Sequence, residues 1–174
     1  MLELPSQIQE IHDRLGISSN YISRSSLPCF DIPTDLVSIG EDVYGRPQQL
    51  RKPAAEKWLE MVEWAQEQEV ELKVVSAYRS ASYQEGLIQR HLARGESIES
   101  ILTRVAAPGF SEHQSGLALD VTSPGYKAVE QVFEESRAFS WLTAYADRFG
   151  FTMSFPKDNP HGVIYEPWHW CYQI

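Results

Sequence analysis

The chain has 174 residues, of which 43% are hydrophobic and 22% charged, a composition typical of a globular protein and not of a disordered one. Its 15 Lys and Arg against 24 Asp and Glu give a formal net charge of -9, the wrong sign for binding nucleic acid or an anionic membrane surface. No apolar run approaches the roughly 20 residues that a membrane span needs, and the N-terminus has no signal-peptide pattern. As given, the sequence predicts a cytoplasmic protein without membrane insertion, or a periplasmic or wall-associated one if a leader was removed.

No repeat or linker-like segment divides the chain, and a chain of this length can bury roughly 70% of its unfolded surface. We expect residues 1–28 to form an N-terminal extension and residues 29–174 to form the main domain. The two cysteines, Cys29 and Cys171, are too few for a disulfide framework, and two reduced thiols are favoured over one bridge. Nothing in the pattern requires more than a monomer.

The hydrophobic pattern predicts several helices. A short amphipathic helix is expected over residues 8–15, and a longer one begins at Pro53 with apolar side chains on one face. Further helices are expected over residues 81–93, 97–105 and 137–149, with Gly95 separating the first two and Gly150 ending the third.

Strands are predicted over residues 71–76 and 116–121, where apolar side chains enter a core. The C-terminal run, residues 163–172, is rich in aromatic residues that favour strands. Strands and helices alternate without the regularity of a doubly wound sheet. We therefore expect an α+β fold in which a small antiparallel sheet is flanked by helices.

Polar side chains are concentrated in three short stretches, residues 76–84, 111–120 and 166–170. In the middle stretch six residues separate His113 from Asp120, which lies within the apolar sequence Leu-Ala-Leu-Asp-Val. A buried carboxylate needs a compensating partner, because burying it alone costs several kcal/mol. A metal ion would be such a partner. An arginine, or a turn before Pro124, would also account for this aspartate.

Glu166 and His169, in the C-terminal stretch, supply the third ligand and the carboxylate that His113 and Asp120 need to form a catalytic metal site. A catalytic zinc site has three N, O or S ligands, an open position for water and a nearby carboxylate that takes a proton. We predict that His113, Asp120 and His169 bind zinc and that Glu166 is the general base. In a regular strand Glu166 and His169 would face opposite sides, so a break is expected where Pro167 separates them.

Several other residues near these motifs allow both a functional and a structural interpretation. Cys171 shares a strand face with His169 and is an alternative zinc ligand. Arg79 would alone suggest a surface ion pair, but beside a zinc site it can hold a substrate carboxylate or an oxyanion. Trp168 is expected to line a substrate cleft, whereas the other C-terminal aromatic residues are expected to pack in the core. The remaining histidines are expected in solvent or in a loop: His12, His91 and His161.

Together the motifs resemble those of the zinc D-alanyl-D-alanine carboxypeptidases of the VanY type, in a wider group that includes hedgehog-like domains and phage endolysins. The family pattern is S-x-Y-R-S with a following glutamine, then S-x-H-x-x-G-x-A-x-D, then E-x-W-H. Every element is present in this order: Ser76, Tyr78, Arg79, Ser80, Gln84, Ser111, His113, Gly116, Ala118, Asp120, Glu166, Trp168 and His169. The resemblance extends from about Asp31 to the C-terminus.

The resemblance implies that zinc is held by His113, Asp120 and His169, that Glu166 moves the proton and that Arg79 orients the substrate or its oxyanion. Residues expected to contact the substrate are Ser76, Tyr78, Gln84, Ser111 and Trp168. Substrates of the family are stem peptides of the bacterial cell wall, which lose a C-terminal D-alanine. We expect a carboxypeptidase of D,D or L,D specificity. The alternatives are a peptidoglycan endopeptidase and a zinc-stabilised module that binds wall peptide without cleaving it.

Overall fold

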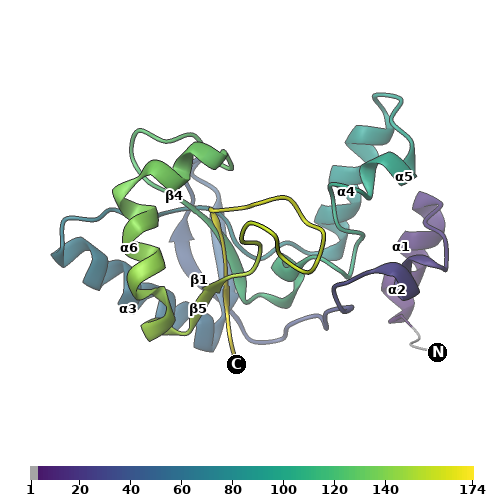
Figure 1. The fold of residues 1–174 in the computed structure, drawn as a ribbon. Helices are drawn as coiled ribbons and strands as arrows, with labels where there is room; N and C mark the ends of the chain where they lie inside the picture. The colour runs from purple at the N-terminus through teal and green to yellow at the C-terminus, as the bar shows by residue number, and fades with distance from the viewer. Residues whose placement is uncertain (1–3) are drawn as a thin grey trace.

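A four-stranded antiparallel sheet lies at the centre of the computed structural model, which describes residues 4–174 (Figure 1). Its strands are ordered β3 (Lys73–Ser76), β4 (Ala118–Thr122), β6 (His169–Tyr172) and β5 (Phe151–Met153). A separate antiparallel hairpin consists of β1 (Leu36–Glu41) and β2 (Pro47–Arg51). The predicted α+β fold with a small antiparallel sheet is confirmed.

Helices flank this sheet, as the sequence predicted. The α-helices are α1 (Ser6–Leu15), α2 (Tyr21–Arg24), α3 (Lys52–Glu67), α4 (Ala81–Leu92), α5 (Ile98–Ile101) and α6 (Arg137–Tyr145). The short 3-10 helices are η1 (Glu112–Ser115), η2 (Gln131–Glu135) and η3 (Ala146–Phe149). Among the described residues, none of the helices is both long and apolar enough to cross a membrane.

The main core lies between one face of the sheet and helices α3 and α6. Alternation along β4 turns Leu119 and Val121 towards this core and leaves Asp120 on the opposite face. Trp58 and Met61 of α3 are buried in the same cluster, which agrees with the apolar face predicted for this helix. Each fully buried side chain of this kind contributes about 1.5–3 kcal/mol of transfer free energy.

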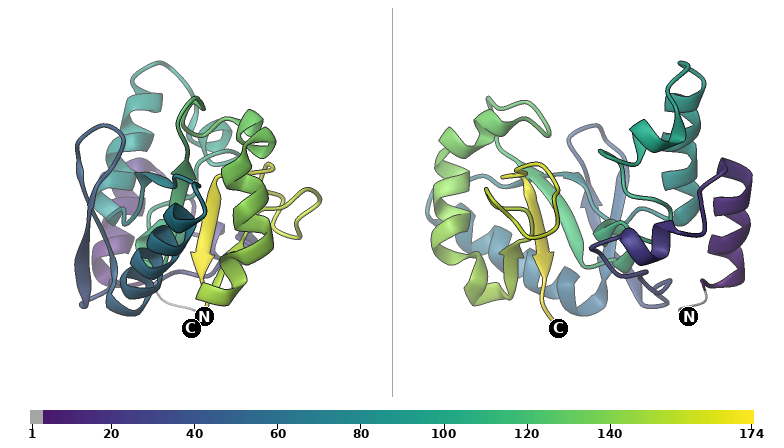
Figure 2. Two further views of the ribbon diagram at one scale, coloured as in Figure 1. Left: turned by 90° about the vertical axis from the view of Figure 1, so that its left-hand side faces the viewer. Right: turned by 45° about the vertical axis from the view of Figure 1, so that its right-hand side comes forward.

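A second cluster joins the N-terminal segment to the helices on the other side of the molecule. Figure 2 shows α1 beside α4, and Ile8, Ile11 and Leu15 are buried there with Ile88 of α4. A paired contact of Arg14 with Glu85, in which both N–O distances are 3.0 Å, ties α1 to α4. The segment predicted as an extension thus packs on the helix that follows β3.

Two predictions about local structure were wrong in part. Of residues 163–172, only His169–Tyr172 form a strand, because Pro167 lacks a backbone N–H and the chain turns there. The helix expected over residues 97–105 is the single turn Ile98–Ile101. The β1–β2 hairpin and β5 were not predicted.

The expectation that His12 is solvated was also wrong. His12 is only 2% exposed, and its Nε2 lies 2.7 Å from the backbone carbonyl of Pro108. A carbonyl can only accept a hydrogen bond, so Nε2 carries a proton and links α1 to the loop that leads to Ser111. His91 is half-buried, and its Nδ1 lies 2.6 Å from Glu96.

We predict a pH-dependent loss of stability from His12. Burial lowers the pKa of His12 below its ordinary value of 6.5. Below about pH 6.5 the unfolded chain therefore binds a proton that the folded chain resists, so the free energy of unfolding falls as the pH falls, by at most about 1.4 kcal/mol per pH unit. Above that pH the effect vanishes. Urea unfolding of wild type and His12→Gln across this range checks it, because the amide can donate to Pro108 but does not titrate. Equal pH dependence in both proteins would contradict the prediction.

Candidate metal centre and active site

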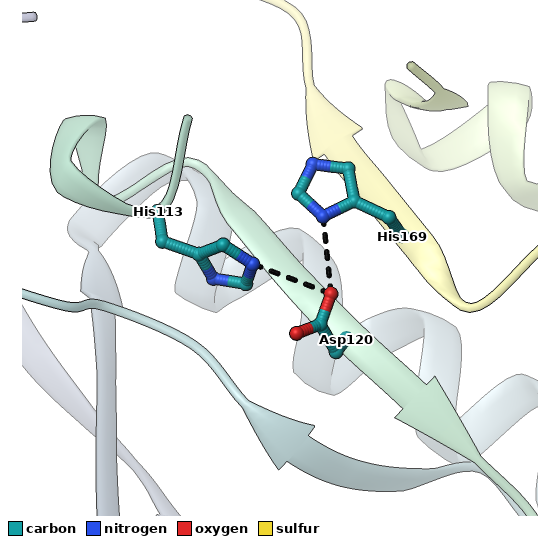
Figure 3. A group of neighbouring side chains, drawn as sticks. All are labelled: His113, Asp120 and His169. Carbon is teal, nitrogen blue, oxygen red and sulfur yellow. Dashed lines mark hydrogen bonds and ion pairs between the residues drawn. The ribbon is translucent and has the colours of Figure 1, made fainter. Parts of the chain in front are cut away.

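His113, Asp120 and His169 come together on the face of the sheet that is turned away from α3 and α6 (Figure 3). Asp120 Oδ1 lies 3.3 Å from His113 Nε2 and 3.0 Å from His169 Nδ1. One potential ligand atom from each residue lies within 4.8 Å of the others, and all three residues are buried. In the part of the chain that the structure describes, this is the one such group of His, Cys, Asp and Glu.

Strand pairing and one tight turn create this arrangement. Asp120 of β4 is directly opposite His169 of β6, so their side chains emerge on the same face. His113 is carried by η1, which ends at Gly116 in the left-handed conformation with φ 71°. A Cβ atom at this glycine would lie 2.9 Å from Arg51 Cγ and 3.0 Å from Leu36 Cδ2. Glycine therefore lets the chain turn from η1 into β4 beneath the hairpin.

The His113 ring presents an unprotonated nitrogen to a carboxylate. Its Nδ1–H donates to the backbone carbonyl of Ala77 at 2.7 Å, which leaves Nε2 facing Asp120. Burial and the positive charge of Arg79 lower the pKa of His113 to about 4, so Nε2 carries no proton at neutral pH. Nε2 is also buried without a hydrogen-bond partner among the described residues. A lone pair that faces a carboxylate calls for a cation between them, and these donors suit zinc.

The other two residues of the group, Asp120 and His169, differ in charge. Burial alone would raise the pKa of Asp120, but the hydrogen bond and charge of His169 hold it well below its usual range, so this carboxylate is ionised. Burial would lower the pKa of His169, whereas hydrogen bonds with Asp120 and Glu112 raise it to about 9. A metal ion held at Nδ1 would therefore have to displace a proton from this imidazole.

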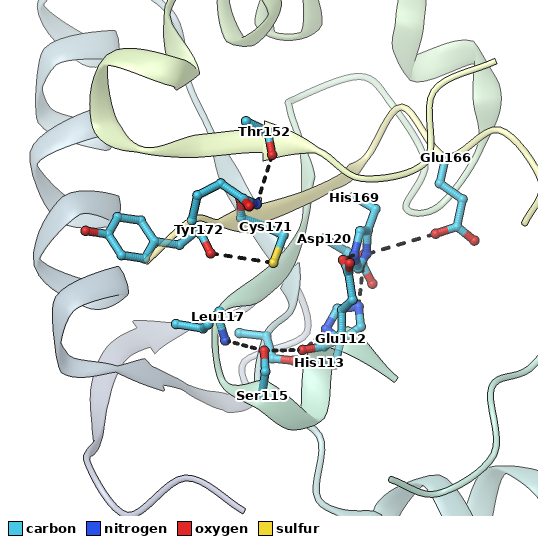
Figure 4. A network of polar contacts seen from close by, with 12 residues as sticks. Glu112, His113, Ser115, Leu117, Asp120, Thr152, Glu166, His169, Cys171 and Tyr172 are labelled. Carbon is cyan, nitrogen blue, oxygen red and sulfur yellow. Dashed lines mark hydrogen bonds and ion pairs between the residues drawn. The ribbon is translucent and has the colours of Figure 1, made fainter. Parts of the chain in front are cut away.

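Glu166 approaches His169 on the side of Nδ1, the nitrogen that faces Asp120. Its Oε2 lies 4.0 Å from His169 Nδ1, and 21% of its side chain is exposed (Figure 4). The backbone N–H of His169 donates to the carbonyl of Glu166 at 3.1 Å, which forms the break predicted at Pro167. Burial raises the pKa of Glu166 to about 7, a value at which a carboxyl group both accepts and releases a proton near neutral pH.

Three residues predicted to act on the substrate retain unused polar groups or lie next to the candidate ligands. Arg79 follows β3, its backbone N–H donates to the carbonyl of His113 at 3.1 Å, and its Nε is buried without a partner in the described chain. Gln84 of α4 donates to the carbonyl of Ala106 at 2.8 Å, while its Oε1 is likewise unpaired. Ser111 is buried directly before η1.

The other predicted residues are placed differently. Ser76 pairs with Asp120 in the sheet, and Tyr78 is half-buried, with a pKa raised by burial. Trp168 lies in the main core with 7% of its surface exposed, so its indole ring contributes to packing. Cys171, the alternative ligand, is outside the group of three, and burial raises the pKa of its thiol. Both cysteines are free.

Glu112 is the residue that sequence reasoning missed. Its Oε2 lies 2.8 Å from His169 Nε2, on the opposite side of the ring from Asp120 (Figure 4). The available signal was a carboxylate directly before a predicted histidine ligand. Its partner is 57 residues away, and only the fold reveals that contact.

The chain is similar to known carboxypeptidases. Residues 47–174 match the VanY family, described as D-alanyl-D-alanine carboxypeptidase. Putative carboxypeptidase YodJ of Bacillus subtilis (strain 168) is 34% identical over 152 residues, which cover 80% of this chain and 54% of YodJ. VanXYC of Enterococcus gallinarum, a bifunctional D-Ala-D-Ala dipeptidase and D-Ala-D-Ala carboxypeptidase, is 32% identical over 139 residues, covering 75% of this chain and 68% of VanXYC. This chain thus spans about half the length of YodJ.

Solved structures share the fold. The LdcB LD-carboxypeptidase aligns with a TM-score of 0.74 and 31% identity, covering 83% of this chain and 71% of the other. A mutant of the vancomycin resistance D,D-pentapeptidase VanY from a VanB-type cassette, in complex with Zn(II), aligns with a TM-score of 0.62 and 26% identity, covering 83% of each chain. The resemblance read from the motifs is confirmed, and the chain belongs to the VanY family of D-alanyl-D-alanine carboxypeptidases.

Proposed function

We propose that this chain is a zinc-dependent carboxypeptidase that removes the C-terminal D-alanine from peptidoglycan stem peptides. The observation that carries the proposal is the unprotonated His113 Nε2 facing the Asp120 carboxylate, with Glu166 beside the same group. The names of YodJ and VanXYC and the Zn(II) complex of VanY support it.

His113, Asp120 and His169 would hold the zinc ion through two imidazole nitrogens and a carboxylate oxygen. Three protein ligands are typical of catalytic zinc, whereas structural zinc usually has four. This difference favours an enzyme over a module that only binds wall peptide. When bound, zinc supplies Lewis acidity, which polarises a carbonyl group and makes water more acidic.

Glu166 would move the proton during hydrolysis. Its carboxylate accepts a proton from the water whose oxygen attacks the carbonyl carbon of the last peptide bond. It then donates this proton to the departing nitrogen as the C–N bond breaks, so D-alanine leaves as a free amine. The pKa of about 7 suits both steps.

Arg79 would bind the negative charge of the substrate. Its guanidinium brings a positive charge to a site with three carboxylates in a chain of net charge -9, and its Nε has no partner in the described chain. A terminal carboxylate or a developing oxyanion is the group that such a cation holds. Gln84 Oε1 and Ser111 would bind the peptide backbone or the terminal carboxylate.

We predict that Glu166→Gln keeps stoichiometric zinc but loses turnover. The amide preserves the size of the side chain but cannot accept the proton, so kcat is expected to fall by about 10²–10⁴-fold. D-alanine release measures turnover, and atomic absorption measures zinc. If the variant releases D-alanine as fast as wild type, Glu166 is not the general base.

Asp120→Ala is expected to lose zinc instead. The change removes one of three ligands and leaves two buried imidazoles without their shared carboxylate. The matched control is Asp147→Ala, which removes an exposed carboxylate from η3. Zinc per chain, measured after dialysis, should drop in the first variant only. Unchanged stoichiometry would assign the ligand role to Cys171 or another donor.

The substrate is tested by mass spectrometry of wall stem pentapeptide and tetrapeptide after incubation with zinc-loaded protein, beside a chelated control. Loss of D-alanine from the pentapeptide alone indicates D,D-carboxypeptidase activity, and loss from the tetrapeptide indicates L,D activity. Release of larger fragments would replace the proposal with an endopeptidase. Binding of both peptides without cleavage would replace it with a binding module.

A further inference from the structure

Glu112 is a largely buried carboxylate that the proposed reaction does not use. Only 14% of its side chain is exposed, and its Oε2 lies 2.8 Å from His169 Nε2. Its carboxylate oxygen is therefore a hydrogen-bond acceptor directed at one nitrogen of a proposed metal ligand.

The two nitrogens of His169 face different carboxylates. Nδ1 faces Asp120 at 3.0 Å, and Nε2 faces Glu112 at 2.8 Å. An ionised carboxylate can only accept a hydrogen bond, so Glu112 requires the proton on Nε2. Neutral imidazole, the form that binds a metal, carries one N–H, so in that form this contact keeps the proton on Nε2 and leaves the lone pair on Nδ1, the nitrogen that faces Asp120.

We infer that Glu112 is a positioning residue, which fixes the tautomer and ring orientation of His169 so that Nδ1 binds the metal. The inference rests on the zinc site of the proposed function and adds to it a residue outside the three ligands. His113 is anchored in the same way through its other nitrogen, because its Nδ1–H donates to the carbonyl of Ala77 at 2.7 Å. Such partners hold ligating histidines and raise their basicity.

One turn supplies both a ligand and the anchor of another ligand. Glu112 and His113 are adjacent in η1, and the hydroxyl of Ser115 donates to the carbonyl of Glu112 at 2.6 Å (Figure 4). The backbone N–H of Arg79 donates to the carbonyl of His113 at 3.1 Å. The position of η1 therefore fixes the orientation of both imidazole rings, that of His113 directly and that of His169 through Glu112.

Other neighbours of His169 do not replace Glu112. Phe155 packs against the His169 ring with centroids 4.9 Å apart, and this apolar contact does not distinguish the two nitrogens. Glu166 lies 4.0 Å from Nδ1, on the side of the ring that faces the ligands. Among the described residues, the Glu112 carboxylate is the group within hydrogen-bond distance of Nε2.

The test compares zinc dissociation constants of wild type, Glu112→Ala and Glu112→Gln, measured by competition with a chromophoric chelator. Glu112→Ala is expected to weaken zinc binding by about 10–100-fold. Glu112→Gln keeps an acceptor for the Nε2 proton, so its loss should be smaller. The matched control is Glu96→Gln. Glu96 contacts His91 at 2.6 Å in a half-buried pair that includes none of the proposed ligands. The zinc affinity of this variant should therefore equal that of wild type.

A spectroscopic readout separates positioning from general destabilisation. In proton–nitrogen NMR spectra of the zinc-loaded protein, the His169 Nε2–H should exchange slowly with water in wild type and Glu112→Gln, and rapidly in Glu112→Ala. Wild-type zinc affinity and slow exchange in Glu112→Ala would overturn the inference while leaving the proposed function intact. If Glu112→Ala does not fold, equal zinc affinity of Glu112→Gln and Glu112→Ser overturns it. Wild type that binds no zinc would overturn the proposed function and this inference with it.

Discussion

The ionised carboxylate of Asp120, in the middle of a buried strand, is the constraint on which the rest of the site depends. An isolated buried charge costs several kcal/mol, so this side chain must be compensated. The fold places an imidazole on each side of it, through the β4–β6 register and through η1. The neutral nitrogen of His113 gives no proton to the carboxylate, so in the absence of a metal the Nδ1–H of protonated His169 is what compensates it, and a bound metal ion would replace that proton.

The two faces of β4 have different roles. Leu119 and Val121 enter the core beneath α3 and α6 and hold the strand in place, while Asp120 points to the opposite face. Rigid support on one face allows three titratable groups to be kept within 4.8 Å of one another on the other. Residues held by packed strands are more precisely placed than residues on loops.

Much of the fold and of the candidate site could be predicted because local sequence patterns indicate them. The apolar face of α3 and the hydrophobic strand around Asp120 are periodic, and the ligand types follow from zinc chemistry. Pro167 correctly indicated the break that brings Glu166 and His169 to one site. The family motifs added the substrate-binding roles of Gln84 and Ser111, which no periodicity would have indicated.

What could not be predicted depends on contacts between distant segments. A glutamate in a polar turn such as Glu112 is usually solvated, and its contact with His169 exists only because β6 lies beside β4. His12 shares a helix face with Ile8 and Ile11, and this spacing already contradicted a solvated side chain. The β1–β2 hairpin is largely exposed, so its sequence lacks the apolar alternation that identifies a strand.

The most direct test of the account is X-ray absorption spectroscopy of the zinc-loaded protein at the zinc edge. The account predicts only nitrogen and oxygen neighbours at about 2.0–2.2 Å, with the outer-shell scattering of two imidazole rings. A sulfur neighbour at about 2.3 Å would contradict it, because Cys171 would then bind the metal and the pairing of His113 with Asp120 would not define the site.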